Sequence, residues 1–154
     1  MGAAREGIWR FFGQAQDQVF EYHNLFACCD GGERDTAKPH TAHCSLFKGN
    51  NDPLQPSTII SPLDPQCLEY FEFDEQGQIH AAEGVEPAEN TIAFLNLRAK
   101  SLRLLRQKAI ETYIFHIWTE EMDTVAEMER LMRPVNGKLE SFCTAIFSVL
   151  RHYP

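Results

Sequence analysis

The sequence has no run of about 18 apolar residues, the length that a membrane-spanning helix needs. Its first residues, MGAAREGIW, lack the apolar core of a secretory signal. No internal repeat is present, which excludes a solenoid or a tandem array. Since 44% of the residues are hydrophobic, the chain of 154 residues can bury one core of ordinary size. These features predict a single domain over residues 1–154 that works in the cytoplasm and has no membrane partner.

The cysteines are unevenly spread along the chain. The five cysteines are an odd number, and Cys143 falls within a helical apolar pattern. This usage is typical of reduced thiols or of a metal site, not of a disulfide framework.

Basic residues are also few, since 14 Lys and Arg stand against 22 Asp and Glu and give a formal net charge of −8. This balance argues against nucleic-acid binding, because phosphate affinity comes from Lys and Arg. The charge is uneven, however: residues 1–98 carry −9 and residues 99–154 carry +1. One stretch holds five positive charges and no acid, and it is the candidate DNA surface: Arg98, Lys100, Arg103, Arg106 and Lys108. The alternative interpretation is a solvated helix face.

The densest chemistry lies between Tyr22 and Asn50, where 29 residues hold three of the five cysteines and three of the six histidines. Thiolate and imidazole are preferred zinc ligands, and this stretch alone offers four: Cys28 or Cys29, His40, His43 and Cys44. The spacing is not that of two CxxC pairs, because the first cysteines are adjacent. The alternative is that Cys28 and Cys29 are small buried residues while the histidines lie on a solvated loop.

The residue patterns predict an α+β fold that is mainly helical. A β-hairpin is expected near residues 68–80, with its turn at Asp74–Gly77. A brief helix is expected from Thr41 to Phe47, ending at Gly49, and another over residues 88–95.

The second half of the chain is expected to form a pair of antiparallel helices. Apolar residues recur at three and four positions from Ser101 to about Leu131, which predicts a helix about 45 Å long with His116 in the core. A shorter amphipathic helix is expected over residues 139–150. The long helix is apolar on more than one side, because Phe115 and Trp118 add to its apolar positions. It is therefore either central to the core or an interface.

A set of short motifs, in a fixed order, resembles one known family. Its members are Tyr22, Asn24–Leu25, Ala27, Cys29, His43–Cys44, Lys48–Gly49, Ile60–Leu63, Asp64–Pro65, Cys67, Phe71, Phe73, Gly77, Thr91–Ile92 and Leu95–Leu97, followed by the basic stretch. Over about residues 20 to 110, this order is similar to the HNH endonuclease family that includes the Septu and retron-associated antiphage nuclease subunit. The resemblance implies a degenerate ββα-metal (HNH-like) region in residues 1–60, a linker and hairpin in residues 61–87, and a helical region in residues 88–154.

The resemblance also implies roles for individual residues. An HNH site holds one divalent cation, Mg²⁺ or Mn²⁺, against the scissile phosphate, with a histidine general base, an asparagine that orients it and a final His or Asn on the metal. Asn24 takes the orienting position and His43 the final one. Cys29 and Cys44 fall on the second half of a structural Zn²⁺ site, and His40 is a further candidate ligand from the same stretch.

The sequence departs from the family in its first motif. A Glu-His-Trp-Arg-Pro-like segment of the family aligns with Gly7–Phe11, where Trp9 and Arg10 agree but the glutamate, the histidine base and the proline are missing. The general base is therefore absent from its expected place. His23 is either a substitute or a partly buried polar side chain.

Three functions remain open on the sequence. The resemblance favours a metal-dependent DNA endonuclease subunit of an antiphage defence system. The missing base and the acidic balance favour a non-catalytic subunit that binds a partner protein, such as the system's ATPase, through the long helix. The third is a zinc-stabilised adaptor with no nuclease ancestry.

Overall fold

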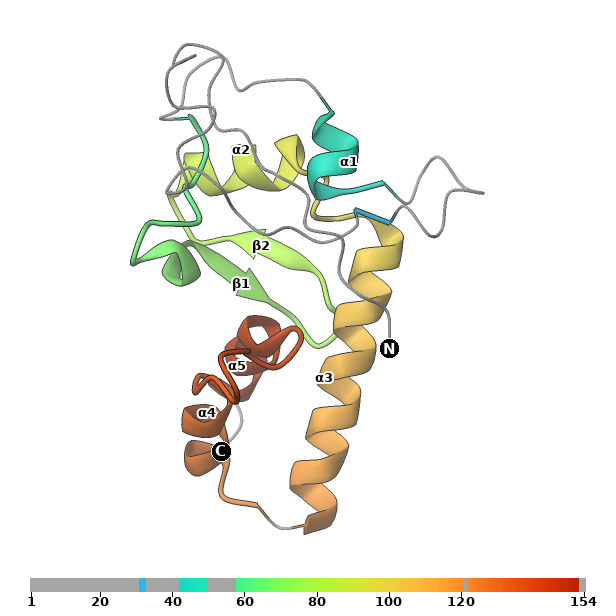
Figure 1. The fold of residues 1–154 in the computed structure, drawn as a ribbon, viewed down its shortest axis with the longest axis vertical. Helices are drawn as coiled ribbons and strands as arrows, with labels where there is room; N and C mark the ends of the chain where they lie inside the picture. Colours follow the sequence, from blue (N-terminus) through green and yellow to red (C-terminus); the bar gives the residue numbers. More distant parts are fainter. Residues whose placement is uncertain (1–30, 33–41, 50–57, 121, 153–154) are drawn as a thin grey trace.

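The computed structural model describes residues 31–32, 42–49, 58–120 and 122–152. Within these residues the fold is α+β and mainly helical, as predicted. Its elements are α1 (Cys44–Lys48), β1 (Phe71–Phe73), β2 (Ile79–Ala81), α2 (Glu86–Phe94), α3 (Lys100–Glu120), α4 (Thr124–Leu131) and α5 (Cys143–Leu150). Figure 1 shows α3 along one side of the molecule, with α1 and α2 near its first turn and α4 and α5 beside its second half. None of the described helices is both long enough and apolar enough to span a bilayer.

The predicted hairpin is confirmed. Strands β1 and β2 pair antiparallel, with Phe71 opposite Ala81 and Phe73 opposite Ile79. The turn ends at Gly77, whose φ of +73° is a left-handed conformation that glycine adopts without strain. A Cβ atom at Gly77 would lie 2.6 Å from the backbone nitrogen of Gln107 and would also meet the carbonyl oxygen of Arg103. The hairpin turn therefore lies directly on the backbone of α3.

The two short helices before α3 form close to their predicted positions. Helix α1 starts at Cys44, later than predicted, because His43 is still extended (φ −146°, ψ 174°) and serves as its N-cap residue. Its C-cap residue is Gly49, with a φ of 55°. Helix α2 starts at Glu86, two residues earlier than predicted, with a proline and two glutamates in its first turn, where they favour helix initiation.

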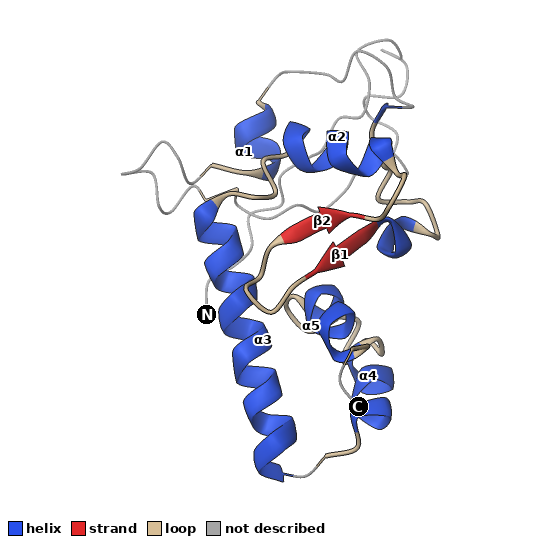
Figure 2. Ribbon diagram, turned by 180° about the vertical axis from the view of Figure 1, so that it is seen from behind, coloured by secondary structure: helices blue, strands red, loops and turns tan. Residues whose placement is uncertain are grey.

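The predicted long helix is wrong in its extent. Helix α3 ends at Glu120 and is about 31 Å long at 1.5 Å per residue. Asp123 then caps α4, since its side chain accepts hydrogen bonds from the backbone N–H groups of Val125 (2.8 Å) and Ala126 (3.1 Å). An aspartate N-cap stabilises a new helix start. As a result the chain turns back, and α4 and α5 lie alongside α3 (Figure 2).

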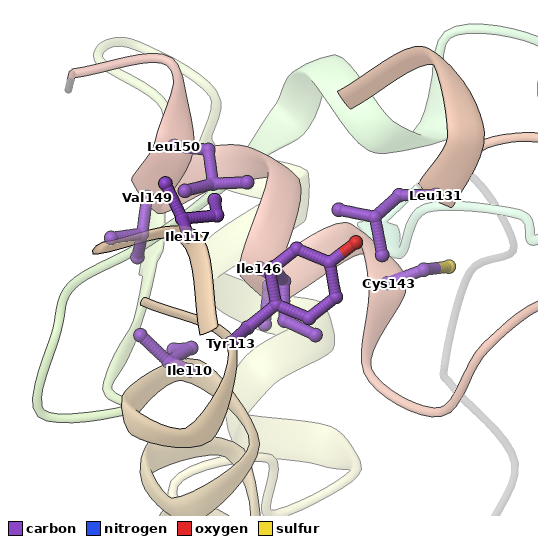
Figure 3. Close-up of a cluster of buried hydrophobic side chains, with 9 residues drawn as sticks. Ile110, Tyr113, Ile117, Leu131, Cys143, Ile146, Val149 and Leu150 are labelled. Carbon is purple, nitrogen blue, oxygen red and sulfur yellow. The ribbon is translucent and has the colours of Figure 1, made fainter. Parts of the chain in front are cut away.

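One hydrophobic cluster joins the three C-terminal helices (Figure 3). Its buried members are Ile110, Tyr113 and Ile117 of α3, Leu131 of α4, and Cys143, Ala145, Ile146, Val149 and Leu150 of α5. Phe73 packs against this cluster, and its backbone N–H donates to Ser148 Oγ at 3.0 Å. Helix α5 therefore holds the hairpin as well as the other two helices. It is shorter than the predicted 139–150, because Phe142 takes a left-handed backbone conformation just before it.

Candidate functional site

The structure describes only some of the predicted site residues. Asn24, Cys29 and His40 lie outside the described residues. The structure describes His43 and Cys44, at the start of α1.

His43 and Cys44 bring an imidazole and a thiol to one place. The His43 residue is only 4% exposed, and its Nδ1 atom lies 3.3 Å from the Sγ atom of Cys44. The backbone N–H of His43 donates to the carbonyl oxygen of Gly31 at 3.0 Å. Gly31 has a φ of +64°, and a Cβ atom there would lie 2.7 Å from the carbonyl oxygen of His43 and 2.7 Å from Leu46 Cβ. The 31–32 segment thus packs tightly against the start of α1.

The turn between α2 and α3 holds the same pair from another direction. The Cys44 N–H donates to the Leu95 carbonyl oxygen at 2.8 Å, and the Asn96 side-chain amide donates to the Ala42 carbonyl oxygen at 2.8 Å. Asn96 has a φ of 48°, a left-handed conformation for which asparagine is one of the better non-glycine residues. Sequence reasoning assigned Asn96 no role beyond the motif set, although an asparagine between two leucines at the end of a helical pattern is a turn signal.

Arg106 is not a surface residue, which corrects its assignment to the DNA surface. It is 5% exposed, and its guanidinium donates to the carbonyl oxygens of Leu97 (2.9 Å) and Gly77 (3.4 Å). The guanidinium also lies over the Phe73 ring, 5.3 Å from its centroid. Burial lowers the pKa of Arg106 to about 10, and the nearby Cys44 acts in the opposite direction. Arg106 therefore joins the hairpin turn to the α2–α3 turn that holds Cys44.

The other four residues of the basic stretch differ in their surroundings. Arg98 forms a bidentate ion pair with Glu89, with N–O distances of 2.5 and 2.9 Å. This ion pair lowers the pKa of the Glu89 carboxylate. Arg103 is half-buried and donates to the Gln76 carbonyl oxygen at 3.5 Å. Lys100 and Lys108 are exposed. The stretch thus spreads around α3 and does not form one positive face.

The described residues do not by themselves fit a metal ion. Among them, no group of three or more His, Cys, Asp or Glu side chains is placed to hold one. His43 and Cys44 supply two donors of the types that zinc prefers, whereas a structural zinc site needs four.

A second polar cluster lines an open cleft of about 710 Å³ between α3 and the returning chain. The Tyr113 hydroxyl donates to Glu127 Oε2 at 2.6 Å, Arg130 Nε donates to the same oxygen at 2.7 Å, and the Arg130 guanidinium also donates to the Tyr113 hydroxyl. Burial of Tyr113, reinforced by Glu127, raises the pKa of the Tyr113 phenol to about 12. Burial acts to raise the pKa of Glu127, but the hydrogen bonds from Tyr113 and Arg130 outweigh it and lower this pKa. The three groups satisfy one another, as in a structural network.

One signal in the sequence points to this cluster, the three-residue spacing of Glu127 and Arg130 on a helix. Their partner Tyr113 reaches them only because the chain turns after Glu120, and the predicted continuous helix would have kept them apart.

Comparison of the sequence with protein-family models and with curated proteins found no match. The resemblance to HNH endonucleases therefore rests on the ordered motifs of the sequence alone.

Proposed function

We propose that this chain is the nuclease-like subunit of an antiphage defence system, built on the scaffold of an HNH-type, metal-dependent DNA endonuclease. The observation that supports this proposal is the pair of hydrogen bonds between the His43–Cys44 segment and the Leu95–Leu97 turn. Ala42 and Asn96, joined by one of them, are 54 positions apart in the sequence. Cys44 and Leu95, joined by the other bond, both belong to the ordered motif set, and motifs inherited together from an ancestral site are expected to adjoin.

In this proposal Asn24 and His43 are the catalytic residues, and Cys29, His40 and Cys44 hold a structural Zn²⁺. The divalent cation of the reaction is Mg²⁺ or Mn²⁺. The buried position of His43, fixed through its backbone by Gly31, suits a side chain that acts inside a protected site.

DNA contact is assigned to the first turn of α3. Lys100 is exposed there and Arg103 is half-exposed. The first turn of α3 lies close to α1 in Figure 1. Arg106 is excluded by its burial. Because only two basic side chains are assigned to this contact on a chain of net charge −8, binding is expected to be weak and to depend only modestly on salt.

Plasmid cleavage by the purified chain in Mg²⁺ or Mn²⁺, paired with metal analysis, tests the proposal. We expect cleavage, with a loss of about 100-fold or more in His43→Ala. His43→Gln, which keeps a polar side chain of similar size, should lose activity equally while retaining its circular dichroism spectrum. His116→Ala is the matched control, because His116 is a solvent-facing histidine of α3 whose side chain is 59% exposed.

Two results would count against the proposal. One is cleavage by His43→Ala at the rate of the unchanged chain. The other is bound zinc without any cleavage, which would support the adaptor.

A second function is supported by a specific observation on α3. Phe115 is 67% exposed and Trp118 is 71% exposed, and neighbouring large apolar side chains on a surface mark an interaction site. With the general base absent from its expected position, the chain would then be a non-catalytic subunit that binds a protein such as the defence ATPase. Copurification separates the two functions. The second function is supported if a partner copurifies with the unchanged chain but not with Trp118→Ser, and if neither protein cleaves DNA.

A further inference from the structure

The outer face of α3 carries a regular stripe of side chains, which we call the outer stripe. Its members are Ser101, Leu104, Lys108, Glu111, Phe115 and Trp118. They recur at intervals of three, four, three, four and three residues, the heptad spacing with which one helix packs along another. The stripe therefore has the pattern of a helix–helix seam.

The outer stripe lies opposite the face of α3 that packs into the molecule. The buried residues of α3 are Leu102, Arg106, Ile110, Tyr113 and Ile117. At 100° per residue they are centred on the side of the helix away from Leu104 and Phe115. Leu104 is 46% exposed, Phe115 67% and Trp118 71%, so no described element covers these three members, whereas Ser101 is partly exposed. In Figures 1 and 2, α5 lies on one side of α3 only.

The outer stripe is complementary to itself when two copies of α3 run antiparallel. A two-fold axis between residues 109 and 110 pairs each residue of one copy with a residue of the second copy. The two paired residues lie equally far from the axis, in opposite directions along the helix sequence. Leu104 then meets Phe115 of the second copy, and Lys108 meets Glu111. Trp118, the largest side chain, meets Ser101, the smallest. Every layer pairs apolar with apolar, positive with negative, or large with small.

Other registers lose this complementarity. A parallel pair would place Lys108 beside Lys108 and Glu111 beside Glu111, which repel each other. An antiparallel pair shifted by seven residues would place Lys108 against Trp118 and Glu111 against Phe115, leaving both charges without an opposite charge in their layers. Burying an unpaired charge in such a seam is costly, so the first register is favoured.

We propose that the outer stripe is the interface of a symmetric homodimer, with a second copy of this chain as its occupant. The inference does not depend on the nuclease proposal. It assigns Phe115 and Trp118 to a second copy of the chain and therefore competes with the protein-binding function given above to the same two residues. The face is about 31 Å long and about 10 Å wide, small beside the roughly 800 Å² per partner of a stable interface. The dimer therefore dissociates on dilution.

Light scattering coupled to size exclusion, from about 1 to about 100 µM, tests the proposal with the full chain. The unchanged protein is expected to approach twice its mass of 17.6 kDa at the upper end. Lys108→Glu and Glu111→Lys each put like charges in the central layers and should raise the dissociation constant at least about tenfold. The double variant restores opposite charges and should return it to within about threefold of the original. Leu63→Ser, at a residue that is 65% exposed and outside α3, is the matched control and should change nothing.

Cross-linking tests the register separately. A mixture of Leu104→Cys chains and Phe115→Cys chains should form disulfide-linked dimers under mild oxidation, whereas each variant alone should not exceed the unchanged protein. A protein that stays monomeric at about 100 µM overturns the proposal. Three other results also overturn the proposal. They are a dimer whose dissociation constant Lys108→Glu leaves unchanged, a double variant that does not regain dimer affinity, and Leu104→Cys chains that cross-link to one another.

Discussion

Glu127 is a buried carboxylate whose charge depends on partners from both sides of the α3–α4 turn. The residue is 8% exposed, and both of its donors, Tyr113 and Arg130, contact the same oxygen. Because its pKa is lower in the folded chain than in the unfolded one, Glu127 stabilises the fold above its ordinary pKa. That stabilisation is lost as the pH falls through the lowered value.

Glu127→Gln should therefore change the pH dependence of stability in one direction. At pH 7 the variant is expected to have a free energy of unfolding lower by about 1–3 kcal/mol, since it loses a charged hydrogen-bond acceptor. Below about pH 4 the difference from the unchanged protein should shrink, because the original carboxylate becomes protonated. Urea unfolding at a series of pH values measures both effects.

The matched control is Glu129→Gln on the same helix. The Glu129 side chain is 65% exposed and pairs with Arg133 at 3.3 Å. Exposed pairs contribute little, so its curve should stay close to that of the unchanged protein. A constant gap between Glu127→Gln and the unchanged protein from pH 7 to pH 3 would contradict the role given to the carboxylate.

Single residues show where charge counting on a sequence fails. Arg106 was grouped with its basic neighbours, but it occupies a place in the buried series of α3, between Leu102 and Ile110. The same three-and-four spacing that predicts the core positions thus predicts the burial of Arg106. His116 was placed in the core, yet its side chain is 59% exposed, because it lies one position before the buried Ile117. Periodicity applied one residue at a time would have corrected both.

At the scale of elements, the fold depends on how closely the hairpin approaches α3. Gly77 is the point of contact, because its missing side chain leaves room for the α3 backbone at Gln107. Gly84 has a similar φ of +78°, but among the described residues no atom lies within 4 Å of where its Cβ would stand. Comparing an alanine substitution at Gly77 with one at Gly84 therefore separates the cost of backbone strain from the cost of a steric clash.

Gly77→Ala is expected to destabilise the protein by about 3 kcal/mol or more, since it combines the left-handed strain with a clash against backbone that cannot move aside. Gly84→Ala should cost only the strain, about 1–2 kcal/mol. Chemical denaturation of the two variants measures the difference. Equal losses would show that the hairpin does not need its close contact with α3.

Elements with local signals were predicted well, and those set by competing signals were not. The hairpin was found because its turn residues and alternating aromatics lie within a dozen positions. The break after Glu120 was missed because the apolar period continues to Leu131 and hides the capping by Asp123. A cap changes the chain's direction without changing the hydrophobic pattern, so periodicity alone cannot find it.

For the molecule as a whole, Arg106 connects three segments that are distant in sequence. It donates to Leu97 and Gly77, it covers Phe73, and Cys44 lies close enough to affect its pKa. The sequence predicted the His43–Cys44 pair as part of a site, but no local pattern linked that pair to Asn96. Such links come from tertiary packing, which only the structure displays.

Arg106→Met should lower the free energy of unfolding by about 1–3 kcal/mol, because two carbonyl groups lose their donor while the side-chain volume is nearly kept. Arg103→Met, at a half-exposed position of the same helix, serves as the control and should cost under about 1 kcal/mol. Thermal unfolding checks stability. DNA binding at low salt should be weakened by Arg103→Met and not by Arg106→Met in chains that remain folded. The opposite order would return Arg106 to the phosphate-binding set.

Five of the nine residues in the hydrophobic cluster come from α5, and the hairpin's bond to Ser148 spans 75 positions of sequence. During synthesis the ribosome completes β1, β2 and α3 long before it supplies the helix that covers them. The nascent chain must therefore keep these apolar surfaces unassembled until α5 has emerged from the exit tunnel. A polypeptide that ends before Cys143 lacks α5 and is therefore expected to aggregate or to be degraded.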